Sequence, residues 1–228
     1  MSINTTTELL SIFRFLNSVY SKYFTGFTLF YYRELPSQFI KTLQRILQQI
    51  LNCKISELDA DVLNDYFVTT WLKSEKIIPY SKCLSGDYSK KRLLACQTIL
   101  QANCKSSPVR VIKTIRILLN MAEELVKKDP TIKVVYFVRD PRAIELSVYD
   151  IEGLNSRKVL EDAENAKVLC DRMLADMDAY HRIKAKYPDN IYLLRYEDLS
   201  EHPEQYTGDL YRFLGLEVPD KVMAWVKS

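Results

Sequence analysis

The run Lys133–Val138 (KVVYFV), which is apolar without interruption after its first residue, most constrains what this 228-residue chain can fold into. Strands buried on both faces of a parallel sheet have such continuous runs, whereas half-exposed strands alternate apolar and polar residues. The run ends at Arg139, and Pro141 two residues later favours the start of a helix. The sequence therefore predicts a central parallel strand that leads directly into a helix.

Two more short runs predict the neighbouring strands. Val109–Ile115 (VRVIKTI) precedes the central run, and Ile191–Leu194 (IYLL) follows it. Apolar residues recur at helical spacing in both intervals, over 117–125 and 169–187. This alternation predicts an α/β fold, a doubly wound parallel sheet with right-handed crossovers and helices on both faces.

The N-terminal half is less regular. A strand is expected over Phe27–Tyr32, and helices over Pro36–Leu51 and Asp59–Leu72. There is no internal repeat and no long linker. We therefore expect a single domain over residues 1–228, with a divergent segment at 1–26.

Composition excludes several kinds of site. Glycine occurs only five times, well below the usual level of about 7%, and neither glycine-rich phosphate-loop motif is present. A nucleotide kinase or hydrolase with such a loop is therefore not expected. Two histidines and no C-x-x-C pair leave little for a metal, so no metal is expected. The even charge balance, +3 overall, does not indicate a nucleic-acid partner.

The end of the central strand is the candidate site, because ligands of such sheets bind beyond the carboxyl ends of the strands. Arg139 lies there, and Ser147 follows two turns into the next helix. A guanidinium and a hydroxyl near a helix start suit a phosphate monoester. In the alternative interpretation, Arg139 pairs with Asp140 or another nearby carboxylate, and Ser147 caps the helix or faces solvent.

The segment after the third strand is interpreted as architectural. Arg195 ends that strand, and we expect a buried pairing with Glu197 or Asp198 to hold the corner rather than to contact a cofactor. A further helix is expected over Pro203–Leu214, closed by Gly215.

Several stretches together resemble one family, the carbohydrate sulfotransferases of the Golgi lumen that act on the 6-hydroxyls of galactose, N-acetylglucosamine and N-acetylgalactosamine. They are SSPVRVIKTIR, VVYFVRDPRAIELS, LLRYEDLSEHPE and YRFLGL, and the resemblance extends from about Phe27 to the end. It implies a P-loop-NTPase-like sulfotransferase fold, a glycan or proteoglycan acceptor, and the donor 3'-phosphoadenosine 5'-phosphosulfate. In the most specific piece, VRDPRAxxxS, Arg139 and Ser147 would bind the 3'-phosphate of that donor.

The resemblance also implies roles for other residues. The segment FYYRELP is similar to the family's aromatic-x-Glu-Pro-Leu segment, with leucine and proline reversed, and makes Glu34 the candidate base for the acceptor hydroxyl. Alternatively, Glu34 is a surface carboxylate paired with Arg33. Lys113 and Arg116 either line the cofactor cleft or cap a strand end.

One family feature does not match. Sulfotransferases hold the 5'-phosphosulfate on an N-terminal strand and a loop that reads approximately Arg-Ser-Gly-Ser/Thr-Ser/Thr, whereas this sequence offers only Thr5–Thr7 there. We therefore expect nucleotide binding with little sulfate transfer by these 228 residues. Either the sequence is N-terminally truncated, or the protein is an inactive member that acts as a nucleotide- or glycan-binding module; the missing family membrane anchor favours truncation.

The five cysteines bear on the compartment. Their odd number leaves one thiol free if four pair, and all five could equally be reduced. The family resemblance implies the Golgi lumen and thus partial oxidation, with a local bridge among Cys83, Cys96 and Cys104. The apolar stretch from Leu9 to Tyr32 is interrupted by polar residues too often to predict a membrane span.

Overall fold

The computed structural model describes residues 37–64, 69, 76–112, 114, 117–152 and 163–228. These fall into two compact units, which divide after Arg116. The predicted strand at Phe27–Tyr32 and half of the helix predicted at Asp59–Leu72 lie outside the described residues.

Every regular element among the described residues of the first unit is a helix. The predicted amphipathic helix at Pro36–Leu51 is confirmed, and its residues Leu43, Ile46, Leu47 and Ile50 form one buried face at helical spacing. This face belongs to a core that includes Tyr80, which is fully buried and donates its hydroxyl to the Leu63 carbonyl. The elements are α3 (Ser37–Leu51), the 3-10 helix η1 (Ile55–Glu57), α4 (Ala60–Leu63), α6 (Ile78–Leu84) and α7 (Lys90–Ser106).

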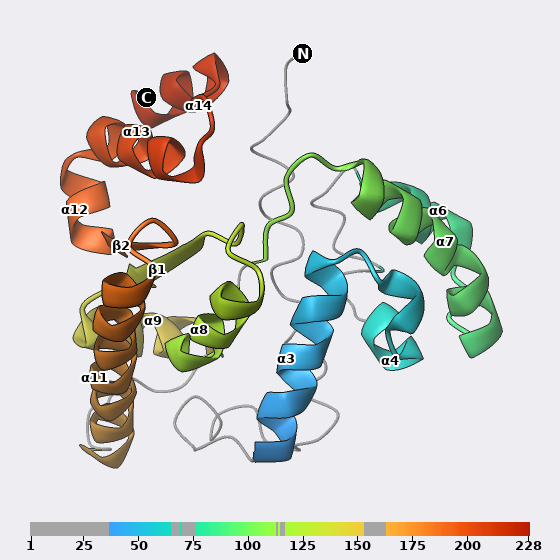
Figure 1. Ribbon diagram of the computed structural model, residues 1–228, viewed down its shortest axis with the longest axis horizontal. Coiled ribbons are helices and arrows are strands. Elements are labelled where there is room, and N and C mark those ends of the chain that lie inside the picture. Colours follow the sequence, from blue (N-terminus) through green and yellow to red (C-terminus); the bar gives the residue numbers. More distant parts are fainter. Residues whose placement is uncertain (1–36, 65–68, 70–75, 113, 115–116, 153–162) are drawn as a thin grey trace. The chain divides into compact units, whose positions relative to one another are not determined.

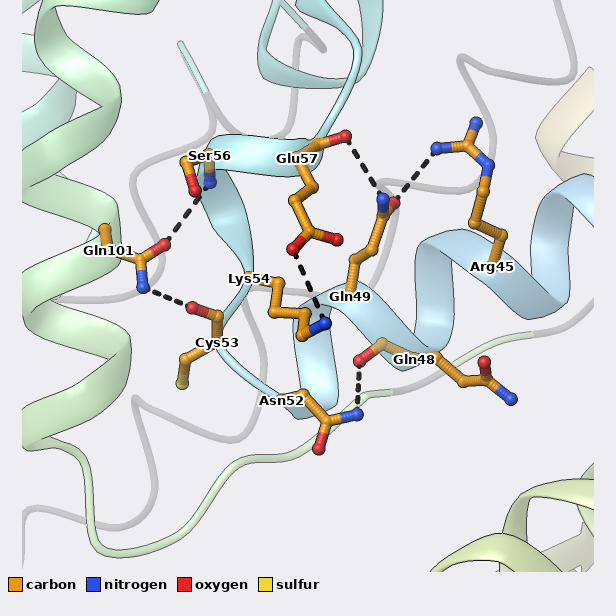
Figure 2. Close-up of polar contacts among 9 residues, drawn as sticks. All are labelled: Arg45, Gln48, Gln49, Asn52, Cys53, Lys54, Ser56, Glu57 and Gln101. Carbon is orange, nitrogen blue, oxygen red and sulfur yellow. Dashed lines mark hydrogen bonds and ion pairs between the residues drawn. The ribbon is translucent and has the colours of Figure 1, made fainter.

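Polar contacts connect the segment after α3 to α7 (Figure 2). The Gln101 side-chain amide donates to the Cys53 carbonyl, and its oxygen accepts the Ser56 N–H at 3.3 Å. Gln49, which is buried, donates to the Glu57 carbonyl at 3.1 Å. These amides satisfy backbone groups in a stretch that has no regular ladder.

Two disulfides cross-link the first unit. Cys53 is bonded to Cys104 of α7, and Cys83 of α6 to Cys96 of α7. Cys170, in the second unit, is an exposed free thiol. The structure thus confirms a local bridge among the closely spaced cysteines and a single unpaired thiol.

The second unit contains the parallel sheet (Figure 1). Strand β1 (Val134–Val138) pairs with β2 (Ile191–Arg195) in a register that runs from Val134 opposite Ile191 to Val138 opposite Arg195. Both strands were predicted from their apolar runs. The helices of this unit are α8 (Leu119–Lys128), α9 (Pro141–Glu152), α11 (Ala163–Lys186), α12 (Tyr196–Glu201), α13 (Pro203–Leu214) and α14 (Asp220–Val226).

Helices contact both faces of this sheet. On one face, Leu119 of α8 and Ile183 of α11 form a buried cluster with Ile191. On the other, Phe213 of α13 stacks on Tyr192 with ring centroids 5.3 Å apart. The α/β architecture is therefore confirmed. The prediction that β1 is buried on both faces is wrong, because Phe137 on the α13 side is 50% exposed.

The strand predicted at Val109–Ile115 is not formed where the structure describes it. Residues 109–112 and 114 are in neither helix nor strand, and 113, 115 and 116 lie outside the described residues. Arg110 interrupts this run, and its guanidinium donates to Cys53 Sγ at 3.7 Å within the first unit. Arg110 thus has a partner beside the disulfide. The sequence of β1, in contrast, contains no charged residue.

The helix boundaries follow local backbone rules. Pro141 is the first residue of α9, as predicted. Helix α13 has the predicted bounds and ends at Gly215, whose φ of 69° is the left-handed conformation that glycine adopts without strain. Among the described residues, no helix is long and apolar enough to cross a membrane.

Candidate functional site

The carboxyl ends of β1 and β2 place Arg139 beside Tyr196. Since Val138 pairs with Arg195, the residues that follow each strand leave the sheet at the same edge. The guanidinium carbon of Arg139 lies 4.5 Å from the centroid of the Tyr196 ring, within the range of a cation–π contact. Phe137 meets the same ring edge-on at 6.3 Å.

No hydrogen bond or ion pair from the Arg139 guanidinium occurs among the described residues. Its Nε is buried and has no hydrogen-bond partner. The neighbouring carboxylate of Asp140 instead accepts hydrogen bonds from Arg142 Nε at 3.0 and 3.1 Å. Among the described residues, Asp140 therefore pairs with Arg142 and not with Arg139.

Asp140 has a structural task at the start of α9. Its carboxylate accepts the Arg142 N–H at 2.9 Å, and its carbonyl accepts the N–H groups of Ala143 and Ile144. The hydrogen bonds from the Arg142 side chain and backbone lower the pKa of Asp140 to about 2. Asp140 is thus an ionised helix cap whose charge is balanced by Arg142.

Glu197 connects the two strand ends. Its Oε1 accepts the Asp140 N–H at 2.9 Å, and this hydrogen bond is the main reason that the pKa of Glu197 lies below its usual value. Arg195 pairs with Asp198 at 3.3 Å, but the Arg195 side chain is 56% exposed. The predicted pairing at this corner therefore exists without being buried, and Glu197 bonds to Asp140 rather than to Arg195.

The other predicted site residues are less closely connected. Ser147 is half-buried on α9, and no hydrogen bond joins it to Arg139 among the described residues. Glu34, Lys113 and Arg116 lie outside the described residues. No cluster of histidine, cysteine and acidic side chains suited to a metal occurs in the described ranges.

The sequence-based interpretation did not link Tyr196 and Glu197 to Arg139 and Asp140. Tyr196 and Glu197 were assigned to an architectural corner, yet they contact Arg139 and Asp140 directly. Their position in the sequence could have indicated this, because Tyr196 directly follows β2 just as Arg139 directly follows β1. In a parallel sheet such residues meet at one edge.

Comparison with known proteins agrees with this architecture. A family model described as a sulfotransferase domain matches residues 40–227. Carbohydrate sulfotransferase 1 of Danio rerio is 30% identical over 157 residues, which cover 63% of this chain and 37% of that protein. Carbohydrate sulfotransferase 4 of Mus musculus is 28% identical over 146 residues, 57% of this chain and 38% of that protein.

The human carbohydrate sulfotransferase 1 is 28% identical over 167 residues, with 63% of this chain and 38% of that protein covered. The chain thus spans less than two fifths of the length of these curated relatives. No solved structure matches it significantly. The match over residues 40–227 confirms the resemblance seen in the sequence, and the chain belongs to the sulfotransferase domain family, with carbohydrate sulfotransferases among its relatives.

Proposed function

We propose that this protein is a sulfotransferase that transfers a sulfuryl group from 3'-phosphoadenosine 5'-phosphosulfate to a sugar 6-hydroxyl of a glycan or proteoglycan. Arg139 and Ser147 bind the 3'-phosphate of the donor. The observation that carries this proposal is the environment of Arg139, whose guanidinium lies over the Tyr196 ring at the strand ends and whose buried Nε has no hydrogen-bond partner.

The residues present fit a phosphate group. A guanidinium offers a planar fork of N–H donors that matches two phosphate oxygens. Asp140 does not compete for this fork because Arg142 holds its carboxylate. The guanidinium carbon lies over the ring of Tyr196 at 4.5 Å from its centroid, and this contact supports the side chain. The hydroxyl of Ser147, on the helix that begins beside Arg139, supplies a weaker neutral donor.

In the proposed reaction, the acceptor hydroxyl oxygen attacks the sulfur atom of the donor. The bond between sulfur and the bridging oxygen of the 5'-phosphate breaks, and adenosine 3',5'-bisphosphate leaves. The hydroxyl proton passes to Glu34, because a neutral alcohol is a poor nucleophile. This role of Glu34 rests on the family resemblance of its segment.

We place the protein in the Golgi lumen. The two disulfides, Cys53–Cys104 and Cys83–Cys96, support this location because such bonds persist in oxidising compartments and are rare in the cytosol. The names of the relatives support a carbohydrate acceptor.

Calorimetric titration with adenosine 3',5'-bisphosphate and with adenosine 5'-monophosphate tests the site. Arg139→Ala should weaken binding of the bisphosphate by about 2 to 5 kcal/mol, since a desolvated charged contact is lost. Ser147→Ala should cost roughly 1 kcal/mol. Arg212→Ala is the matched control, because this arginine is exposed on α13 and paired with Asp209. Equal affinities of the wild type and Arg139→Ala would remove Arg139 from the site.

A transfer assay with labelled donor and keratan, chondroitin and mucin-type acceptors separates the enzyme from the alternative binding module. That alternative is considered because these 228 residues contain no Arg-Ser-Gly loop. Nucleotide binding that depends on Arg139, combined with no transfer to any acceptor, would show that these 228 residues bind the nucleotide without catalysing transfer, as the binding module requires. Transfer by the unmodified chain would show that another segment does the work of that loop.

A further inference from the structure

We propose that Glu197 is a positioning residue for the anion site: by accepting the Asp140 N–H it holds the peptide that joins Arg139 to Asp140, and so determines where the guanidinium lies. This inference rests on the proposed function, in which Arg139 binds the 3'-phosphate.

The sheet itself cannot provide this contact. The last paired residues are Val138 and Arg195, and beyond them the main chain of β2 turns into α12 at Tyr196. The Asp140 N–H therefore lies past the end of the ladder. A backbone N–H that is left without a partner destabilises the conformation that buries it. Glu197 Oε1 accepts this N–H at 2.9 Å, where a further strand residue would otherwise do so, and thereby holds the loop in place.

Two consecutive residues of α12 contact two consecutive residues after β1. Tyr196 lies against the Arg139 guanidinium, and the next residue, Glu197, binds the Asp140 backbone. One contact orients the side chain and the other orients the peptide from which it projects. Since 57 residues separate Glu197 from Asp140, the pairing holds distant segments of the chain together. This double contact aligns the donors of Arg139 before a ligand arrives.

The charge of Glu197 argues for a geometric role. The Asp140 N–H and the Glu197 N–H keep its pKa low, so it is ionised at neutral pH. A carboxylate near a phosphate site is electrostatically unfavourable by itself. The side chain should therefore contribute as a hydrogen-bond acceptor and not as a charge, and glutamine should replace it.

The test compares Glu197→Ala with Glu197→Gln, in calorimetric titrations with adenosine 3',5'-bisphosphate and adenosine 5'-monophosphate. We expect Glu197→Ala to bind the bisphosphate about tenfold more weakly, with less than about a twofold change for the monophosphate. Glu197→Gln should bind both like the wild type. Glu201→Ala, an exposed glutamate at the end of the same helix, is the control and should change neither affinity.

A double-mutant cycle shows whether Glu197 acts through Arg139. In an Arg139→Ala background, Glu197→Ala should cause no further loss of bisphosphate affinity. Additive losses would overturn the proposal, as would an equal loss for both nucleotides. Stronger binding by both Glu197 variants would assign the residue a purely electrostatic effect, which also contradicts a positioning role.

Amide hydrogen exchange at Asp140, measured without nucleotide, tests the contact independently of ligand binding. Exchange should be faster in Glu197→Ala than in the wild type and Glu197→Gln, and equal rates would refute the contact. If the wild type binds no bisphosphate but these exchange rates differ as expected, the contact between Glu197 and Asp140 exists and the proposed function is wrong. The positioning role is then wrong as well, because there is no bound phosphate to position. Should Glu197→Ala not fold, Glu197→Asp, whose carboxylate is one methylene shorter, replaces it in every comparison.

Discussion

Replacing Tyr196 by leucine tests how much the ring beneath Arg139 contributes to anion binding. The guanidinium carbon lies 4.5 Å from the ring centroid, well inside the limit of about 6 Å for a cation–π contact. Tyr196 is 40% exposed while Arg139 Nε is buried, so the contact lies between the exposed and desolvated cases. We therefore expect a loss of about 1 kcal/mol, which is roughly a fivefold weaker Kd for adenosine 3',5'-bisphosphate.

Calorimetric titration measures this loss, and thermal unfolding of each variant checks that the fold is retained. Tyr196→Phe keeps the ring and should bind like the wild type. Tyr88→Leu, which changes an exposed tyrosine of the first unit, should also have no effect. The reasoning fails if Tyr196→Leu binds as tightly as the wild type. It fails equally if Tyr196→Phe binds as weakly as Tyr196→Leu, because the hydroxyl and not the ring would then matter.

Four further outcomes are expected. Alkylation without reductant should modify only Cys170, and mass mapping that found five modified thiols would contradict both disulfides. Replacing Cys53 and Cys104 by serine should lower the free energy of unfolding by about 4 kcal/mol in a denaturant titration, because the bond closes a long loop; an unchanged midpoint would refute this. Asp176 accepts the Leu119 N–H at the start of α8, so Asp176→Ala should cost about 1 kcal/mol, whereas Asp176→Asn keeps an acceptor. Burial raises the pKa of Asp176 above 3.8, so its contribution to stability is complete below that pH and is lost as the pH rises through the folded pKa. Asp176→Asn should remove this dependence, and an unchanged pH profile would contradict it.

Much of the second unit was predictable because the signals are local. The apolar runs of β1 and β2 indicate strands by their own composition, and proline and glycine mark the start of α9 and the end of α13 through their backbone preferences. The position of Arg139 at a strand end followed from the same reasoning. The run at Val109–Ile115 shows where such local reasoning fails. A β-branched run forms a strand only where a partner strand is available, and Arg110 in this run instead contacts Cys53.

The sequence by itself therefore determined which segments of the second unit are strands and helices, and which arginine ends a strand, because these properties depend on neighbours along the chain. Only the tertiary structure decided the partners. It assigned Asp140 to Arg142, brought Glu197 to the Asp140 N–H and Tyr196 to Arg139, and paired Cys53 with Cys104. Such contacts join residues far apart in sequence or choose among several nearby charges. They depend on strand register and helix packing, which arise only when distant segments are assembled around a common core.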